Sequence, residues 1–141
     1  VPAAALMADK IMPHLDFVSI GTNDLTQYAM AADRMAPGLA SLTDPWQPAV
    51  LRLIKMTCDE GQRQNVPVGI CGEAAADPLL AVVLTGLGVN SLSAASTALA
   101  GVGAQLAEVD LATCRQAAEA ALDAEDSQQA RDVVRAVIAA G

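Results

Sequence analysis

The chain has 141 residues, of which 53% are hydrophobic and 17% are charged, and its formal net charge is −8. This length suits one domain with a sizeable core, and the high apolar content excludes intrinsic disorder. With only 8 Lys and Arg residues, the chain lacks the basic patches of a nucleic-acid surface. No apolar stretch approaches the roughly 20 residues that a membrane span requires.

The first half of the chain predicts two short helices, a strand and one longer helix. Pro2 suits the first turn of a helix that Pro13 ends, and Pro48 suits the first turn of the longer helix. Gly21 and the polar residues that follow it stop the strand. The expected elements are a helix at 3–12, a strand at 17–20, a helix from 22–26 to 34, a loop at 35–47 and a helix at 48–64.

In the second half, strand-like segments alternate with helical ones. Asp77 followed by Pro78 is typical of a helix start, and Gly86 and Gly88 are expected to stop that helix. The expected elements are a strand at 66–71, a helix at 79–87, a strand at 89–93, a helix at 98–106 and two tail helices at 111–124 and 127–139.

Strand, loop and helix, repeated three times, predict parallel βαβ units and hence an α/β fold. Three strands are few for a parallel sheet that stands alone, whereas a closed eight-stranded barrel takes about 250 residues, so the chain would supply about three-eighths of one. We expect βα units over residues 1–107 and C-terminal helices over residues 108–141.

The three cysteines, Cys58, Cys71 and Cys114, show no CxxC spacing and so indicate neither a disulfide framework nor a zinc site. We expect a reducing, cytoplasmic location, and the first residues show no secretory signal. Because the sequence begins with Val1 and not Met, we expect it to start within a longer protein.

Functional residues of α/β folds cluster where the strands end, and this rule selects residues 21–24 and 69–73. In the first segment, Asn23 and Asp24 offer an amide and a carboxylate side by side, and Asp is a hard oxygen ligand suited to Mg²⁺. The alternative is that these two residues cap the helix that follows.

Arg34 and Cys71 are the other two candidates. The Arg34 guanidinium would return to the same end of the sheet and bind carboxylate or phosphate there, or else it is a solvated charge paired with Asp33. Cys71, with Glu73 two residues away, is a candidate nucleophile or acid–base group, or else a small buried hydrophobe. Cys58 lies on a helical pattern, as does Cys114, and both are expected to be structural.

Two segments, FVSIGTNDLTQY (17–28) followed by DR (33–34), and VGICGE (68–73), closely resemble the two signatures of the phosphoenolpyruvate-utilising enzymes. Their order and spacing match as well. The resemblance runs from residue 1 to about residue 106 and is looser over the two tail helices.

Within these enzymes, the resemblance is strongest to the Enzyme I family, the phosphoenolpyruvate–protein phosphotransferases of the bacterial phosphotransferase system. It rests on QY (27–28) and on GLG (86–88) before SLS (91–93). In the last loop, Ala94 and Ala98 depart from the family, which tends to have Met and Pro there.

The resemblance implies a fold and a role for each candidate residue. The three predicted strands would be strands six to eight of a C-terminal (β/α)₈ barrel. Asp24 would be a Mg²⁺ ligand, Asn23 would contact the phosphate of phosphoenolpyruvate, and Arg34 would hold the anionic groups of the substrate. Cys71 would be the acid that protonates the enolate carbon to yield pyruvate.

The resemblance also implies partners. The parent protein would bind phosphoenolpyruvate and Mg²⁺, phosphorylate its own histidine in an N-terminal domain, and pass the phosphoryl group to a small carrier protein in sugar transport. A homodimer is expected, and nucleic acid and membrane are not expected as partners. The alternatives are a barrel of the pyruvate phosphate dikinase or phosphoenolpyruvate synthase type, or a non-catalytic module whose open strand edges pair with another copy.

We expect the isolated chain to lack phosphotransferase activity. The resemblance implies that a second metal carboxylate lies immediately before Val1 and that the phosphorylated histidine lies elsewhere, since His14 does not match its motif. The measurement is pyruvate formation from phosphoenolpyruvate with carrier protein and Mg²⁺. Robust turnover by the 141-residue chain would contradict this expectation.

Overall fold

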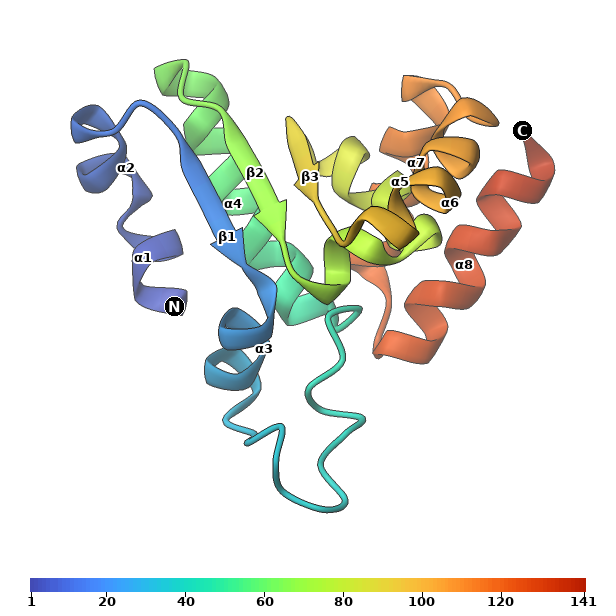
Figure 1. Cartoon of the computed structure of the whole chain (residues 1–141), viewed down its shortest axis with the longest axis horizontal. Helices are drawn as coiled ribbons and strands as arrows, with labels where there is room; N and C mark the ends of the chain where they lie inside the picture. Colours follow the sequence, from blue (N-terminus) through green and yellow to red (C-terminus); the bar gives the residue numbers. More distant parts are fainter.

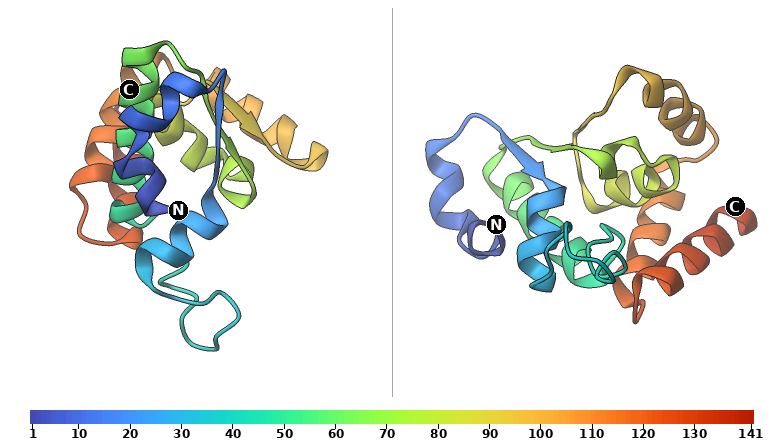
Figure 2. Two further views of the ribbon diagram at one scale, coloured as in Figure 1. Left: turned by 90° about the vertical axis from the view of Figure 1, so that its left-hand side faces the viewer. Right: turned by 60° about the horizontal axis from the view of Figure 1, so that its bottom comes forward.

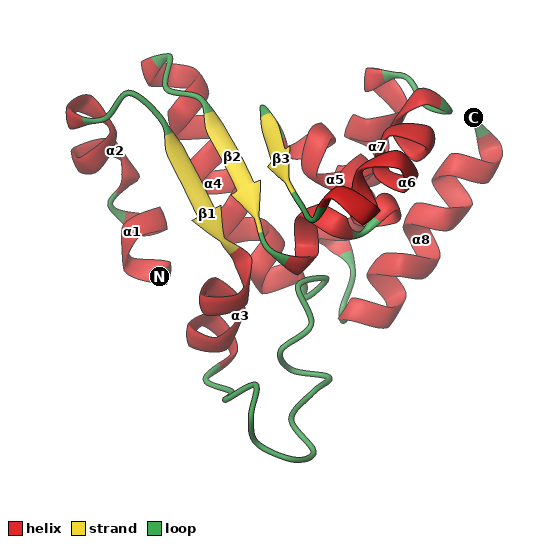
Figure 3. Ribbon diagram, in the orientation of Figure 1, coloured by secondary structure: helices red, strands yellow, loops and turns green.

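Three parallel strands alternate with helices along the chain in the computed structural model, which describes all residues from 1 to 141 (Figures 1 and 3). The elements are α1 (Pro2–Leu6), α2 (Ala8–Ile11), the 3₁₀ turn η1 (Met12–His14), β1 (Val18–Gly21), α3 (Thr22–Met30), α4 (Pro48–Gln64), β2 (Val68–Cys71), the 3₁₀ turn η2 (Glu73–Ala76), α5 (Pro78–Leu87), β3 (Ser91–Ser93), α6 (Ser96–Ala107), α7 (Leu111–Asp123) and α8 (Ser127–Ala140). The predicted α/β fold is confirmed.

The strands form one sheet in the order β1-β2-β3, and both neighbouring pairs are parallel. Helix α4 lies behind β1 and β2 in Figure 1, and the side view in Figure 2 places it on one side of the strands. Val68 and Ile70 of β2 belong to the same buried cluster as Ile54 of α4. This face of the sheet therefore makes the hydrophobic core.

The other face of the sheet carries small side chains. Side chains alternate between the two faces of a strand, so the rows in register with Ser19 and with Gly21 share the face away from the core. Its members are Ser19, Gly21, Gly69, Cys71, Ser91 and Ser93. Most of them are exposed, although a Cβ at Gly69 would lie 2.5 Å from the Ser91 hydroxyl.

Two helices differ from the prediction. The expected helix at 3–12 is interrupted at Met7, where φ is −107° and ψ is 19°, and the two pieces α1 and α2 both pack on α4. The helix expected to reach residue 34 ends at Met30, because Ala31 adopts a left-handed conformation with φ of 50°. This turn buries Ala32 and frees the following residues from the helix.

Helix α5 is the most deeply buried helix and packs closely against α7. Gly86 was expected to stop α5, but it lies inside the helix, which ends at Leu87 with Gly88 in the left-handed conformation (φ 102°). A Cβ on Gly86 would lie 2.0 Å from the carbonyl oxygen of Cys114 and 2.9 Å from the Cβ of Ala118. The glycine is therefore needed for the close approach of the two helices. None of the helices combines the length and the apolar character that a membrane crossing needs.

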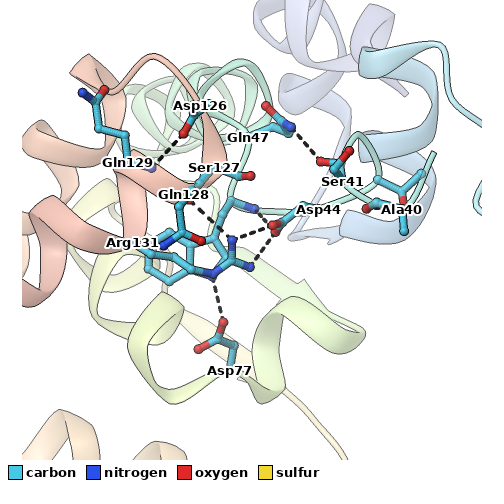
Figure 4. Close-up of polar contacts among 12 residues, drawn as sticks. Ala40, Ser41, Asp44, Gln47, Asp77, Asp126, Ser127, Gln128, Gln129 and Arg131 are labelled. Carbon is cyan, nitrogen blue, oxygen red and sulfur yellow. Dashed lines mark hydrogen bonds and ion pairs between the residues drawn. The ribbon is translucent and has the colours of Figure 1, made fainter. Parts of the chain in front are cut away.

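The long loop between α3 and α4 is anchored by a cluster of four residues, Asp44, Trp46, Asp77 and Arg131, which we call the Trp46 cluster. The Trp46 side chain is fully buried, and its indole Nε1–H donates a hydrogen bond of 2.8 Å to Asp77 Oδ2. Arg131 of α8 lies over the indole ring at 5.3 Å and contacts both carboxylate oxygens of Asp44 at 2.6 and 2.9 Å. Figure 4 shows Arg131, Asp44 and Asp77 gathered from three parts of the chain.

Replacement of Gly86 by Ala should destabilise the chain, because the added methyl group meets backbone across the α5–α7 contact. We expect a loss of about 1–3 kcal/mol in the free energy of unfolding, as for other overpacked cores. Gly103, inside α6, has no atom within 4 Å of a built Cβ and provides the matched control. Gly103→Ala should stabilise by up to about 1 kcal/mol through helix propensity.

Urea unfolding followed by circular dichroism measures both variants. A Gly86→Ala variant that gains stability as Gly103→Ala does would contradict the packing inferred for α5 and α7.

Candidate functional site

The two segments selected by the sequence meet at one end of the sheet. Gly21, the last residue of β1, stands in register with Cys71, the last residue of β2. The Thr22 hydroxyl donates a hydrogen bond of 3.3 Å to the Cys71 carbonyl oxygen, and the Cys71 thiol donates one of 3.5 Å to the Ile20 carbonyl oxygen. Each of the two segments therefore donates a hydrogen bond to the other strand or its end.

Gly72 brings the second segment close to the first. Its φ of 92° and ψ of −160° lie in a region that only glycine adopts readily. A Cβ at Gly72 would lie 3.7 Å from Asn23 Oδ1 and 3.7 Å from Thr22 Oγ1. The backbone of the second segment therefore passes beside the Asn23 amide, and the glycine leaves the space between them open.

Asn23 and Asp24 lie within the first turn of α3 and do not cap it. The N-cap position belongs to Gly21, and no side chain makes a capping hydrogen bond there. The capping alternative is therefore wrong, and the reason is that the helix starts directly at the end of β1 without a connecting turn. Asn23 is half-buried beside Gly72 and Asp24 is exposed. The Asp24 carboxylate stands at a helix N-terminus, where the helix dipole stabilises negative charge.

The fit of a divalent cation rests on Asp24 alone. No group of three or more His, Cys, Asp and Glu side chains gathers anywhere in the chain. Mg²⁺ commonly takes only one or two protein carboxylates and fills its remaining positions with water and substrate oxygens. The exposed Asp24 carboxylate, which takes part in none of the ion pairs, fits such a partial site.

Arg34 follows α3 as an exposed residue of the long loop. Its backbone N–H donates to Gln27 Oε1 at 3.2 Å, which folds the start of the loop back onto α3. Asp33 does not pair with the guanidinium. Its carboxylate accepts the Met35 N–H at 2.8 Å instead, so the alternative of an Asp33–Arg34 pair is wrong. The guanidinium is left available to an anion.

The three cysteines differ in environment. Cys58 and Cys114 are buried, as expected for structural residues, and burial raises the pKa of both thiols, that of Cys58 to about 12. Cys71 is only half-buried and belongs to the face of the sheet away from the core, in register with Ser93. Cys71 is therefore the thiol that a small molecule at this end of the sheet would meet.

Sequence reasoning missed Thr22 and the Trp46 cluster as residues that shape the site. Thr22 lies inside a motif whose neighbouring amide and carboxylate drew attention, yet its fully buried hydroxyl joins the two segments. Trp46 is the one tryptophan of the chain and stands in a proline-rich loop. A large aromatic side chain with a polar N–H in such a loop is a signal for a buried anchor.

The Asn23 amide, the Asp24 carboxylate and the Cys71 thiol thus lie near the carboxyl ends of β1 and β2. The Arg34 guanidinium lies on the loop that follows α3. Residues 1–111 match the family described as PEP-utilising enzyme, PEP-binding domain. The chain belongs to this family, and the resemblance that its two motifs indicated is confirmed.

Curated relatives include proteins with phosphotransferase names. A phosphoenolpyruvate-protein phosphotransferase of Streptomyces coelicolor is 48% identical over 138 residues, which cover 98% of this chain and 25% of the relative. One of Haloferax volcanii is 45% identical over 133 residues, 94% of this chain and 24% of the relative. A multiphosphoryl transfer protein of Xanthomonas campestris pv. campestris is 47% identical over 131 residues, 93% of this chain and 16% of the relative. The chain therefore spans a quarter or less of the length of these relatives.

Native-state alkylation should modify Cys71 selectively. The reagent should reach the half-buried Cys71 thiol, whereas burial excludes it from Cys58 and Cys114 and also raises the pKa of both, which keeps them protonated at about pH 8. Mass spectrometry after brief iodoacetamide treatment measures the modified peptides, and Cys71→Ser should abolish the labelling. Comparable labelling of Cys58 in the folded chain would contradict the burial described above.

Proposed function

We propose that this chain is the phosphoenolpyruvate-binding part of a phosphoenolpyruvate–protein phosphotransferase of the Enzyme I type, which starts the sugar phosphotransferase relay. The observation that carries the proposal is the meeting of the two motif segments through the Gly21–Cys71 register and the Thr22–Cys71 hydrogen bond. Family membership and the names of the relatives add support.

In this proposal the anionic substrate is bound at the end of β1. Asn23 would donate its amide N–H to a phosphate oxygen, and Arg34 would bind the carboxylate or phosphate through its planar set of donors. Asp24 would contribute a carboxylate to Mg²⁺, and the bound cation supplies charge neutralisation to the phosphoryl group. The half-buried amide and the two exposed charged groups suit a site that opens to solvent.

Cys71 would act after the phosphoryl group has left. Breaking the P–O bond transfers the phosphoryl group to an acceptor histidine outside this chain and leaves the enolate of pyruvate. The Cys71 S–H would then donate its proton to the methylene carbon, which completes pyruvate, and the thiolate would regain a proton from water. A thiol that must remain reduced requires a reducing compartment, and a cytoplasmic location is part of the proposal.

The proposal includes the architecture of the larger domain. We infer that β1, β2 and β3 are strands six to eight of a (β/α)₈ barrel, with βα units at 1–107 and C-terminal helices at 108–141. Three sequential parallel strands with the candidate site at their carboxyl ends support this inference. β1 and β3 each pair with β2 alone, so both edges of the sheet remain available to further strands.

A small histidine-phosphorylated carrier protein and a second copy of the protein are the proposed macromolecular partners. The carrier follows from the Enzyme I type, since a phosphoryl group on the acceptor histidine needs a recipient. An apolar groove of about 250 Å³ runs beside β1, lined by residues such as Ala8, Ile11 and Leu15. This groove and the open strand edges favour association with further protein.

A chimera provides the test. This chain would replace the matched 138-residue region of the Streptomyces coelicolor relative, and pyruvate formation from phosphoenolpyruvate would be measured with phosphocarrier and Mg²⁺. We expect the chimera to turn over phosphoenolpyruvate, and turnover to fall about 100-fold or more in Asp24→Asn and in Cys71→Ala. The first variant removes the carboxylate proposed to hold Mg²⁺, and the second removes the proposed proton donor.

Asp16→Asn is the matched control for the charge change, because Asp16 is exposed and precedes β1 at the opposite end of the strand. It should leave turnover unchanged. A folded chimera that forms pyruvate no faster than its Asp24→Asn variant would refute the proposed function.

A further inference from the structure

The long loop between α3 and α4 consists of successive hydrogen-bonded turns, and both of its ends are fixed to other parts of the chain. At its start, Gln27 accepts the N–H of Arg34. Backbone hydrogen bonds then follow one another from Ala36 to Asp33, from Leu39 to Ala36 and from Leu42 to Leu39. Because these turns are continuous, the position of the loop's far end affects the position of its first residues, which include Arg34.

The far end of the loop is fixed by the Trp46 cluster. Asp44 accepts the Trp46 backbone N–H at 3.0 Å, in addition to its two contacts with Arg131. The Asp44 side chain is 16% exposed and that of Arg131 is 27% exposed, so the pair is largely shielded from water. A bidentate ion pair that is shielded from water and lies over an indole ring holds its geometry better than an exposed ion pair does.

Asp77 joins this loop to the segment that carries Cys71. Its Oδ1 accepts the N–H groups of Leu79 and Leu80 and so caps α5, as predicted, while its Oδ2 accepts the indole N–H of Trp46. Only the turn η2 and Gly72 separate Asp77 from Cys71. The hydrogen bond between Trp46 and Asp77 therefore connects the loop between α3 and α4 to the segment that follows β2.

We propose that Trp46 and Asp77 are positioning residues for the anionic substrate, because their hydrogen bond sets the place of the Arg34 loop relative to the Cys71 segment. The inference rests on the proposed function. Arg131 supports it from α8, so the C-terminal helix takes part in substrate binding without touching the substrate. Cys71 itself is also held by the sheet and by Thr22. Loss of the Trp46–Asp77 bond should therefore weaken substrate binding more than it slows the proton transfer.

The test uses the chimera described above and the variants Trp46→Phe and Asp77→Asn. Phe keeps most of the buried ring and removes the N–H donor, and Asn keeps an oxygen to cap α5. We expect KM for phosphoenolpyruvate to rise about three- to tenfold in each variant, with kcat within about twofold of the parent chimera; tenfold corresponds to about 1.4 kcal/mol of binding. In the double variant the two effects should not add, since both remove the same bond.

Arg135→Met is the matched control on α8. Arg135 lies one turn beyond Arg131 and forms an exposed pair with Asp132, in which both side chains are 60% exposed. It should leave KM unchanged, whereas Arg131→Met should raise it. Melting temperatures measured on each variant establish that the assays contain folded protein.

Two results would overturn the proposal. If Trp46→Phe lowers the melting temperature and leaves KM unchanged, the Trp46 cluster is a structural anchor alone. If the effects of Trp46→Phe and Asp77→Asn on KM add fully, the two residues act separately. Failure of the proposed function is distinguished from both, because the unsubstituted chimera would then form no pyruvate, and the positioning role would fall with it.

Discussion

The parallel register of β1 and β2 is the constraint on which the candidate site depends. It sets Gly21 beside Cys71, so the residues that follow each strand lie at the same end of the sheet, where the strands terminate. A slip of one residue would turn Cys71 toward the core and move Val68 and Ile70 away from it. The burial of those two side chains against α4 therefore fixes the position of the thiol.

The helices around the sheet are held by two different kinds of contact. Between α5 and α7 the helices approach closely over Gly86 and buried alanines, where dispersion and shape dominate. Between the long loop, α5 and α8 the contact is polar and depends on the few directed bonds of the Trp46 cluster. The α5–α7 contact extends the core that the sheet forms with α4. The Trp46 cluster fixes a loop in which Ala32 and Trp46 are the only buried residues.

The sequence allowed the strand–helix alternation, the Asp77 cap and the family to be predicted, because periodicity, Pro positions and motif residues are local signals. It did not reveal the break at Met7 or the end of α3 at Met30. The left-handed Ala31 carries no local mark, and tertiary packing decides its conformation. Gly86 was misjudged for the same reason, because its role depends on Cys114, which is distant in sequence. Hydrogen bonds such as Thr22 to Cys71 and Trp46 to Asp77 join residues far apart in the chain, so no local pattern predicts them.

In the proposed barrel, the small side chains on the face of the sheet away from the core would set a condition on the remaining strands. Barrel interiors are normally filled by bulky branched side chains contributed in layers. Ser19, Ser91 and Ser93, with two glycines and Cys71, contribute little volume to such layers. In a closed barrel the opposite strands would have to supply most of the filling, and the hydroxyl groups would face either their polar atoms or trapped water. The two halves of such a barrel would thus differ in side-chain volume, with the thiol on the sparsely filled side.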